Sequence, residues 1–590
     1  MDMSQEKQNL LHFEFMDKSK KVNPLTFTSP EEIIVARTIE EVIPCLERIQ
    51  EAVKSGLYAA GYLTYEAAPA FDPSFTVNKD NKMPLLWFGL FHHPSKPVDK
   101  QPEPFSVGDW IPDISTGEYH SNINKIKQYI KNGDTYQVNY TIRLHSSING
   151  DDFGYFKQLS KGQAANFCAY LSTEEYSILS ASPELFFHLK DSQITTRPMK
   201  GTIQRGKSPA EDMTNLKWLS TSEKNRSENL MIVDLIRNDL GQIAETGSVK
   251  VPHIFSIEKY PTVYQMTSTV TANIAPDATI IDILSALFPC GSITGAPKIS
   301  TMNIIHELED SPREVYCGAI GYITPEMEAI FNVPIRTVIV DKATGKATYG
   351  VGGGITWDSK VDEEYKEIQT KATLLKKKQP HFQLLESLYL EDGQYFLFDK
   401  HMERMEKSAE YFGYSIDRTD IVRKLQRYAS DYGQHPEKVR LLVSEGGEIT
   451  VEGIAVSPLP KMVNASLAGV PIDKEEIFLY HKTTNRVVYS SVKDDYPDVY
   501  DVLLWNDLGE LTEFTTGNLV VEMGGELLTP YVESGLLAGT FRKHLLDHHQ
   551  IREEQLMIGD IKHCSAIWLI NSVRKWIRVN LVEERTSGTS

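Results

Sequence analysis

Apolar residues recur along the chain at two different spacings, and the two spacings alternate. Helical spacing, in which apolar positions return every three or four residues, marks residues 40–53, 229–240 and 299–308. Short apolar runs and strand-like alternation mark residues 87–93, 175–189, 316–324, 332–340 and 346–356. The pattern predicts mixed helix and strand in the first 115 residues. From about residue 116 to 373 it predicts a large α+β domain with a layered β-sheet core.

This periodicity stops at LLKKKQP, where a basic run ends in proline. We expect a linker over residues 374–381, between a first domain (1–373) and a second domain (382–581). In the second domain, FQLLESLYLEDGQYFLF predicts a β-hairpin that turns at Asp392–Gly393. The segment DKHMERMEKSAEYFG that follows predicts a capped amphipathic helix. The polar end, residues 582–590, is expected to be disordered.

The charge balance narrows the range of partners. The chain has 590 residues, enough for more than one core, and a net charge of −19 with both signs interspersed, which argues against binding to nucleic acid or to an anionic membrane. No stretch of about 18 apolar residues occurs, and the first residues lack the segments of a secretion signal. The five cysteines have neither paired nor metal-ligand spacing. These features predict a cytoplasmic protein whose partners are small molecules or other proteins.

Acidic side chains gather on two of the expected helices. In EEYKEIQTKA, Glu364, Glu367 and Lys371 fall on one helical face, a spacing that is also typical of a solvated charged stripe. Glu228 lies on the same side of its helix as Ile232, and a carboxylate on such a face needs a cation because unpaired burial is costly. Two carboxylate clusters on separate helices favour Mg²⁺ over zinc, for which no set of histidines and cysteines is present.

Two glycine-bearing segments can receive an anion. GVGGGIT (350–356) departs from the dinucleotide-binding fingerprint, and GSITGAPK (291–298) departs from the spacing of a phosphate-binding loop. Their backbone N–H groups can still bind a carboxylate, and Arg336 offers two parallel donors for one. The alternative interpretation of both segments is a tight turn between strands.

Several segments, taken in order, carry a family resemblance. They are RPMKGT, SENLMIVDLIRNDLG, GSITGAPK, YCGAIGY, NVPIRT and GVGGGIT followed by EEYKEIQTKA, over about residues 116–373. Together they resemble the chorismate-utilising enzymes. The informative position is Lys200 in RPMKGT, because anthranilate synthase large subunits are similar but have alanine there, whereas component I of aminodeoxychorismate synthase has lysine. The resemblance therefore implies the aminodeoxychorismate synthase branch.

The resemblance also implies a role for each matching residue. Lys200 is implied to add to chorismate at C2, and Glu184 to protonate the departing C4 hydroxyl. Both roles agree with their chemistry, since a lysine in a dry pocket loses its proton readily and apolar neighbours raise the pKa of a carboxyl group. Glu228 and Glu367 are implied as Mg²⁺ ligands, with Glu364 in support. The positions implied to bind the substrate are Gly201, Thr202, Tyr316, Arg336, Gly352, Gly354 and Lys371.

One position departs from this family. In SIEKYPTVYQMTS, Gln265 stands where many members have a histidine near the reacting ring, and glutamine cannot shuttle a proton at neutral pH. Either that histidine is dispensable for amination or this domain is slow. The segment GDTYQVNYTIRL (133–144) resembles a structural segment behind the active site, and no catalytic role is assigned to it.

The second domain has ordered matches of its own. HKTTNRVVY, LTEFTTGNLVVEMGGELLTP and SGLLAGTFRKHLL, within about residues 382–581, resemble fold type IV pyridoxal-phosphate enzymes, especially aminodeoxychorismate lyase. Taken alone, Lys482 is more typical of a surface lysine. The resemblance implies that Lys482 binds pyridoxal phosphate covalently and that Glu513 faces its pyridine nitrogen. Arg404, Gly539 and Thr540 are implied to bind its phosphate. The strand and loop before FQLLESLYL are shortened relative to that family.

The two resemblances imply consecutive reactions. A bifunctional enzyme would convert chorismate and ammonia into 4-amino-4-deoxychorismate with Mg²⁺, and would then release pyruvate to leave 4-aminobenzoate, the folate precursor. No Cys-His amidotransferase triad is recognisable, so a separate glutaminase subunit is the expected source of ammonia, and a homodimer through the second domain is common among relatives. Two alternatives stay open. One is an anthranilate synthase large subunit fused to a fold type IV aminotransferase, and the other is a non-catalytic chorismate-binding scaffold, motivated by Gln265.

Overall fold

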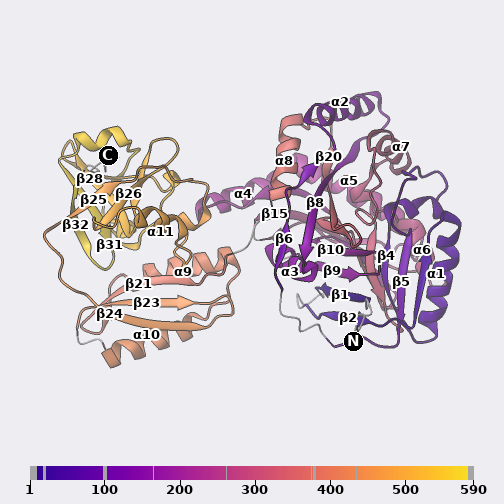
Figure 1. Cartoon of the computed structure of the whole chain (residues 1–590), viewed down its shortest axis with the longest axis horizontal. Helices are drawn as coiled ribbons and strands as arrows, with labels where there is room; N and C mark the ends of the chain where they lie inside the picture. Colours follow the sequence, from indigo (N-terminus) through magenta and orange to yellow (C-terminus); the bar gives the residue numbers. More distant parts are fainter. Residues whose placement is uncertain are drawn as a thin grey trace. The chain divides into compact units, whose positions relative to one another are not determined.

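The chain divides into two compact units (Figure 1). The computed structural model describes residues 9–16, 22–96, 103–163, 165–260, 262–373, 375, 380–432 and 435–582. One unit comprises Met1–Gln204 with Leu216–Gln379, and the other comprises Arg205–Asn215 with Pro380–Ser590. Most of the expected linker and the tail from residue 583 lie outside the described residues. In the described part of the chain, no helix is long and apolar enough to cross a membrane.

Two antiparallel sheets form the centre of the first unit. One has the strand order β16-β8-β20-β19-β10-β9-β1-β2, with β6 and β7 pairing on β8. Its strands are β1 (Leu10–Phe15), β2 (Leu25–Thr28), β6 (Phe105–Val107), β7 (Ile111–Pro112), β8 (Gln137–Gly150), β9 (Phe167–Ser172), β10 (Tyr176–Ser182), β16 (Gly295–Ala296), β19 (Thr337–Asp341) and β20 (Lys346–Ile355). The other has the order β13-β15-β12-β11-β18-β17-β4-β5-β3, with β14 pairing on β15. Its strands are β3 (Glu32–Ala36), β4 (Tyr58–Leu63), β5 (Leu86–Phe91), β11 (Leu185–Lys190), β12 (Gln193–Arg197), β13 (Met199–Gln204), β14 (Lys250–Lys259), β15 (Val263–Asn273), β17 (Ala319–Ile323) and β18 (Ala329–Asn332).

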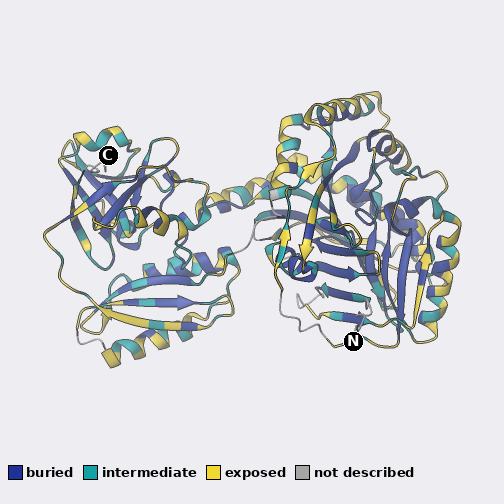
Figure 2. Ribbon diagram, in the orientation of Figure 1, coloured by how far each residue is buried: buried dark blue, intermediate teal, exposed yellow. Residues whose placement is uncertain are grey.

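Helices cover the outer face of each sheet, so the first unit is built in layers. The helices are α1 (Ile39–Lys54), α2 (Thr116–Asn132), α3 (Asp152–Gln163), α5 (Glu223–Gly241), α6 (Ile280–Leu287), α7 (Lys298–Leu308) and α8 (Val361–Thr373). A further helix, α4 (Pro209–Thr221), has its first residues in the second unit and its last residues in the first. Apolar residues of α1, α5 and α6 pack on the sheet that contains β15, and those of α2, α3, α7 and α8 pack on the sheet that contains β8. Between the sheets lies a cluster that includes Phe13, Phe27, Tyr62 and Trp87. Figure 2 shows these strands largely buried and the outer helix faces exposed, which confirms the layered α+β prediction.

Local sequence explains where these helices begin and end. At the start of α1, the Glu41 carboxylate accepts a hydrogen bond of 3.1 Å from the backbone N–H of Thr38, which satisfies a free helix donor. Ser115 Oγ accepts from the backbone N–H of Glu118 at 3.2 Å in the first turn of α2. That helix ends at Gly133, whose φ of +86° is left-handed and therefore favours glycine.

A closed barrel forms the larger part of the second unit. Its sheet has the order β27-β26-β25-β32-β31-β28-β29-β30, and β27 also pairs with β28, which closes six strands into a ring. The strands are β25 (Met462–Leu467), β26 (Asp501–Trp505), β27 (Leu511–Phe514), β28 (Gly517–Met523), β29 (Glu526–Thr529), β30 (Arg552–Glu553), β31 (Ala566–Asn571) and β32 (Lys575–Leu581). Two helices accompany the barrel, α11 (Val487–Asp494) and α12 (Thr540–Asp547).

The rest of the second unit is a four-stranded sheet in the order β22-β21-β23-β24, on which α9 and α10 pack. Its elements are β21 (Leu384–Glu391), β22 (Gln394–Tyr395), α9 (Phe398–Phe412), α10 (Arg418–Tyr432), β23 (Glu437–Val443) and β24 (Ile449–Ala455). Leu390 pairs with Tyr395 across the turn at Asp392–Gly393, which confirms the predicted hairpin. The predicted helix after it is α9, which ends at a left-handed Gly413.

Residues 205–215 belong to the second unit, although the sequence on both sides of them belongs to the first. The Arg205 guanidinium makes two hydrogen bonds of 2.6 Å with the Asp212 carboxylate and lies 4.1 Å from the centre of the Tyr411 ring in α9. The second unit is therefore built from two separate stretches of the chain.

Candidate active sites

Lys200 lies on β13 beside a glycine that the fold requires. Gly201 has a φ of +93°, and a Cβ added there would lie 3.0 Å from the side chain of Asn225. Burial lowers the pKa of the Lys200 ammonium, whereas the carboxyl groups of Glu228 and Glu184 act in the opposite direction. The site therefore contains a lysine that loses its proton more readily than an exposed one.

Glu184 is a buried carboxyl group whose charge interacts with that lysine. It lies between β10 and β11, and its side chain and backbone are only 2% exposed. Ser292 donates a hydrogen bond of 2.5 Å to Oε1 of Glu184. Burial raises the pKa of the Glu184 carboxyl group to about 7, although Ser292 and Lys200 both favour its charged form. A carboxyl group with this pKa can donate a proton near neutral pH.

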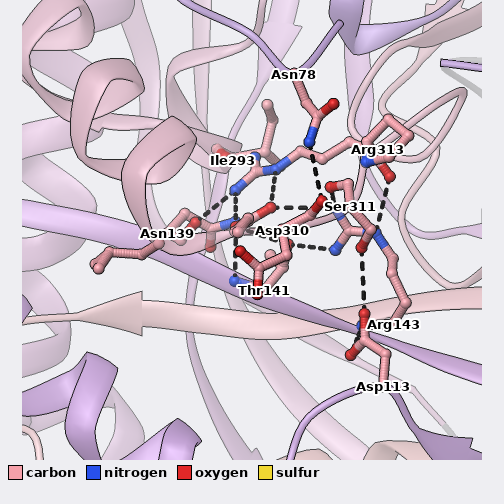
Figure 3. Close-up of polar contacts among 12 residues, drawn as sticks. Asn78, Asp113, Asn139, Thr141, Arg143, Ile293, Asp310, Ser311 and Arg313 are labelled. Carbon is pink, nitrogen blue, oxygen red and sulfur yellow. Dashed lines mark hydrogen bonds and ion pairs between the residues drawn. The ribbon is translucent and has the colours of Figure 1, made fainter. Parts of the chain in front are cut away.

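A buried network of ion pairs and hydrogen bonds holds the segment that carries Ser292 (Figure 3). The Arg313 guanidinium donates to the carbonyl oxygens of Ile293 and Asn139, at 2.8 Å each. The same guanidinium is paired with the Glu309 carboxylate at 2.7 Å. Asn139 belongs to β8, so the network ties the segment around Ser292 to the central sheet and thereby orients the hydroxyl that contacts the buried carboxyl group.

Gln137, at the start of β8, is a candidate site residue that the sequence did not point to. It is 1% exposed, and neither atom of its side-chain amide has a hydrogen-bond partner within the described residues. A Cβ added at Gly354 would lie 1.8 Å from Nε2 of Gln137 and 3.1 Å from Nζ of Lys200, so these groups meet at one point. Buried amides are nearly always hydrogen bonded, so this one indicates a place for a ligand. In the sequence, Gln137 is marked only as a polar residue within GDTYQVNYTIRL, a segment that was not expected to be catalytic.

Glu228 on α5 and Glu364 and Glu367 on α8 are the residues predicted to bind magnesium. Burial raises the pKa of Glu228 and of Glu364, and the negative charge of Glu367 contributes to both shifts. No group of three or more side chains that could hold a metal ion is already gathered in the described part of the chain. Carboxylates on two helices that are costly to charge without a cation nevertheless fit Mg²⁺, which keeps several waters and takes few protein ligands.

Lys371 is paired with one of these carboxylates. Its Nζ lies 2.8 Å from Oε1 of Glu367, one turn earlier on α8, and donates to the carbonyl oxygen of Gly352 at 2.7 Å. The charge of Lys371 is the largest cause of a lowered pKa at Glu367. The side chain of Glu367 remains 51% exposed. The helical face predicted from spacing thus contacts β20 through Lys371. The neighbouring Glu367 on the same face remains accessible to solvent.

GVGGGIT is a strand, so its interpretation as a tight turn is wrong. It forms the end of β20 and pairs with β8 along its length, whereas β19 pairs with β20 only at residues 347–349. Within the described residues, the other edge of β20 therefore has no strand partner from Gly350 onward. A Cβ at Gly350 would lie 2.2 Å from the Tyr316 ring, so this glycine is needed for close packing. GSITGAPK does form a turn, with a 3₁₀ helix at Gly291–Ile293 before β16.

Gln265, the residue that the resemblance places where many family members have a histidine, lies on β15. Its Oε1 accepts a hydrogen bond of 2.7 Å from the hydroxyl of Thr202, and its Nε2 donates to the carbonyl oxygen of Gly201 at 2.9 Å. Both ends of this amide are therefore used to hold the strand of Lys200.

The predicted substrate residue Arg336 donates a hydrogen bond of 2.9 Å to the Oε1 of Gln163.

The second unit contains a cavity of about 510 Å³ that all five predicted cofactor residues line: Arg404, Lys482, Glu513, Gly539 and Thr540. Burial lowers the pKa of the Lys482 ammonium to about 7, and the nearby charge of Arg404 acts in the same direction. An amine with this pKa is partly uncharged at neutral pH and can act as a nucleophile or a base.

Glu513, on β27, is surrounded by hydrogen-bond donors. It is 3% exposed and accepts hydrogen bonds from the Tyr489 hydroxyl at 2.8 Å, the Asn518 amide at 3.0 Å and the backbone N–H of Leu537 at 3.0 Å. Burial raises its pKa to about 7. A carboxylate oriented in this way suits a protonated ring nitrogen, whose positive charge would offset the cost of burial.

Arg404 and the start of α12 form a subsite for an anion, in contrast to Glu513, which suits a positively charged group. The Arg404 guanidinium is held by two hydrogen bonds to Glu386, at 2.8 and 2.6 Å. Gly539 precedes Thr540 at the N-terminus of α12, and a Cβ on this glycine would lie 1.9 Å from Oδ1 of Asn518. The free N–H groups of a helix N-terminus and a fixed guanidinium together suit a phosphate. The cavity therefore has the lysine, carboxylate and anion subsite that fit pyridoxal phosphate.

Comparison with known proteins agrees with this division. Residues 14–377 match the family of chorismate binding enzymes, and residues 383–582 match amino-transferase class IV. Aminodeoxychorismate synthase component 1 of Escherichia coli (strain K12) is 42% identical over 271 residues, which are 46% of this chain and 59% of the relative. The protein of the same name from Bacillus subtilis (strain 168) is 38% identical over 275 residues, 47% of this chain and 58% of the relative. This chain therefore matches less than two thirds of either relative.

Among solved structures, anthranilate synthase component I from Streptococcus pneumoniae TIGR4 shares the fold of the first unit. It has a TM-score of 0.51 and 24% sequence identity, and the match covers 64% of this chain and 94% of that chain. The layered sheets and the ordered motifs thus agree with the family match over more than half of the sequence. The chain belongs to the chorismate binding enzyme family, and an amino-transferase class IV domain follows its chorismate-binding domain.

Proposed function

We propose that the chain makes 4-aminobenzoate from chorismate and ammonia in two steps, one in each unit. The observation that carries the proposal is the pairing of a half-buried Lys200 with a buried Glu184, with pKa values shifted toward the neutral amine and the neutral acid. A neutral amine can attack, and a neutral acid can protonate a leaving group. The relatives named above support the same branch of the family.

In the first step, the uncharged amine of Lys200 forms a bond to C2 of chorismate, the ring double bonds shift, and the C4 hydroxyl leaves as water with the proton of Glu184. Ammonia then adds at C4, and the C–N bond to Lys200 breaks, which returns the lysine and gives 4-amino-4-deoxychorismate. Glu228 and Glu367, with Glu364 in support, would hold a Mg²⁺ ion whose charge offsets that of the ring carboxylate. Gln137 would orient the Lys200 amine or the incoming ammonia through its unpaired amide.

The ammonia would come from a separate glutaminase subunit. Burial raises the pKa of all five cysteine thiols: Cys45, Cys168, Cys290, Cys317 and Cys564. A cysteine nucleophile needs a lowered pKa, so none of these thiols is prepared for glutamine hydrolysis. The designation component 1 of the relatives agrees with a second component. A homodimer through the second unit belongs to the same proposal.

In the second step, the other unit would release pyruvate from 4-amino-4-deoxychorismate. Pyridoxal phosphate, when bound, supplies the electron sink for this elimination. Lys482 would hold the cofactor and then take the proton from the carbon that bears the substrate's amine. Glu513 would keep the ring nitrogen protonated, and Arg404 with the start of α12 would hold the phosphate. Loss of pyruvate leaves an aromatic ring, which makes the step favourable.

The test is incubation of the pure full-length protein with chorismate, ammonium, Mg²⁺ and pyridoxal phosphate, with products identified by mass and chromatography against both aminobenzoate isomers. We expect 4-aminobenzoate and equimolar pyruvate. Formation of 2-aminobenzoate would instead indicate an anthranilate synthase, and transfer of an amino group to a keto acid would indicate an aminotransferase. Chorismate that binds but does not react would indicate a scaffold.

A further inference from the structure

The cavity of the second unit contains more positive charge than its cofactor subsites account for. Six cationic side chains line it: Arg404, Lys438, Arg440, Lys482, Arg486 and Arg574. Glu513 is the one acidic residue among the lining residues. Two of the six cations have a carboxylate partner outside the lining, since Arg404 is held by Glu386 at 2.6 Å and Arg440 lies 3.5 Å from Glu452.

Lys438, Arg486 and Arg574 have no carboxylate partner among the described residues. Arg486 donates to the carbonyl oxygen of Thr515 and lies 4.4 Å from the centre of the Tyr489 ring. Arg574, in the turn between β31 and β32, donates to a backbone carbonyl oxygen. Each guanidinium is therefore oriented by neutral groups, which leaves its charge uncompensated.

These cations also lie close together. Lys438 and Arg440 are two residues apart on β23, so their side chains lie on the same face of the sheet. The charges of Arg440, Arg486 and Arg574 add to burial in lowering the pKa of Lys438. Like charges around one cavity repel one another, and an anionic ligand that contacts several of them removes this cost.

We propose that Lys438, Arg486 and Arg574 form a subsite that binds a substrate carboxylate, so that the second unit selects amines with two carboxylates. The inference rests on the proposed function, because 4-amino-4-deoxychorismate has one carboxylate on its ring and one on its enolpyruvyl side chain. Arg404 and the N-terminus of α12 are left for the cofactor's phosphate. The subsite identifies which residues distinguish this substrate from an ordinary amino acid with a single carboxylate.

The experiment measures binding of unreactive probes to the full-length protein loaded with pyridoxal phosphate. Isothermal titration calorimetry compares isophthalate, which has two carboxylates, with benzoate, which has one, and with inorganic phosphate. We expect isophthalate to bind about tenfold more tightly than benzoate, since hydrogen bonds between charged groups are the stronger ones. The preference should disappear in Lys438→Met and Arg574→Met, and Lys438→Arg should retain it. Arg427→Met, which removes an exposed cation of α10 outside the cavity, is the matched control.

Two results would overturn the subsite. One is equal binding of isophthalate and benzoate by the unsubstituted protein, and the other is a preference that both methionine variants keep. A loss of pyridoxal phosphate from these variants, with probe preference unchanged, would reassign the cations to the phosphate. Pyruvate release is followed separately. If pyruvate never forms but the isophthalate preference follows the cations, the proposed function fails and the subsite stands. If every variant forms pyruvate at the same rate and has the same affinity for 4-amino-4-deoxychorismate, the subsite fails and the function stands.

Discussion

The Ser292 hydroxyl donates a hydrogen bond of 2.5 Å to the Glu184 carboxyl group, in a part of the first unit where both residues are buried. This bond favours the charged form of Glu184, whereas burial favours the neutral form and prevails. The balance between the two sets the pH range in which Glu184 can act as an acid.

We therefore predict that the first reaction slows above about pH 7, the pKa of Glu184 in the folded chain. Ser292→Ala removes a donor to the charged form, so the decline should move to higher pH by roughly one unit. The measurement is the pH profile of kcat/KM for chorismate consumption, at a constant concentration of uncharged ammonia. An unshifted profile in Ser292→Ala would contradict the assignment of this acid.

The same pKa predicts a change in stability. Because the pKa of Glu184 is about 7 in the folded chain and near 4.5 when unfolded, the native state binds the extra proton between these values. Its contribution to stability therefore falls as pH rises from about 4.5 to 7. Glu184→Gln, which cannot become charged, should be more stable than the unsubstituted chain at pH 8 by up to about 3 kcal/mol. Urea unfolding at pH 5 and pH 8 measures the difference, which should be small at pH 5.

Lys200→Ala should abolish the first reaction, with a loss of at least about 100-fold, because no other amine replaces the covalent nucleophile. Lys200→Arg should be equally inactive, since a guanidinium keeps its proton. Both variants should still release pyruvate from supplied 4-amino-4-deoxychorismate at the normal rate. Formation of that intermediate from chorismate by Lys200→Ala at an unchanged rate would exclude the covalent role.

Glu228→Gln and Glu367→Gln should lower the affinity for Mg²⁺ and the Mg²⁺-dependent turnover of the first reaction, since each removes a negative charge from the proposed cation site. Lys371→Met should have the opposite effect on Mg²⁺ affinity in the absence of chorismate, because it removes the ammonium that lies 2.8 Å from Glu367. Calorimetric titration with Mg²⁺ measures both. Glu363→Gln, on the same helix and paired with Lys360 in solvent, is the control. Unchanged affinity in all variants would mean that these charges are only a solvated stripe.

Gln137→Leu should lower the rate of the first reaction without lowering the free energy of unfolding. The substitution keeps most of the side-chain volume and removes two polar atoms that have no partner in the described residues, so no hydrogen bond is lost. Gln163→Leu is the matched control, because Oε1 of Gln163 accepts a hydrogen bond from Arg336. Loss of this bond should lower the free energy of unfolding by about 1–3 kcal/mol. A Gln137→Leu variant that is fully active would show that this amide does not contact the reactants.

Lys482→Ala should lose the visible absorption of bound pyridoxal phosphate and should accumulate 4-amino-4-deoxychorismate from chorismate. Chelation of Mg²⁺ should do the reverse, stopping the first reaction and sparing the second. Product analysis by mass and the absorption spectrum measure both effects. Release of pyruvate by Lys482→Ala at the normal rate, in a preparation free of other lyases, would rule out the assignment of the second unit.

The sequence alone determined the secondary-structure elements and the candidate residues that can be recognised from the order of motifs along the chain. Apolar spacing predicted the layered α+β domain, the hairpin at Asp392–Gly393 and the helix α9, because helix and strand periodicity and turn residues are local properties of the sequence. The ordered motifs also pointed to the chorismate binding enzymes, since motif order is a property of the chain itself. The residues proposed as active, Lys200 and Lys482 among them, were named on that basis.

Tertiary structure decided the features that depend on groups far apart in sequence. The unpaired amide of Gln137 became informative only beside Gly354, more than 200 residues later, because burial without a partner is a property of the packed chain. The same holds for the grouping of residues 205–215 with the second unit. It holds as well for the cations Lys438, Arg486 and Arg574, which come from three separate segments. Their closeness, and therefore their mutual repulsion, exists only once the chain has brought those segments around one cavity.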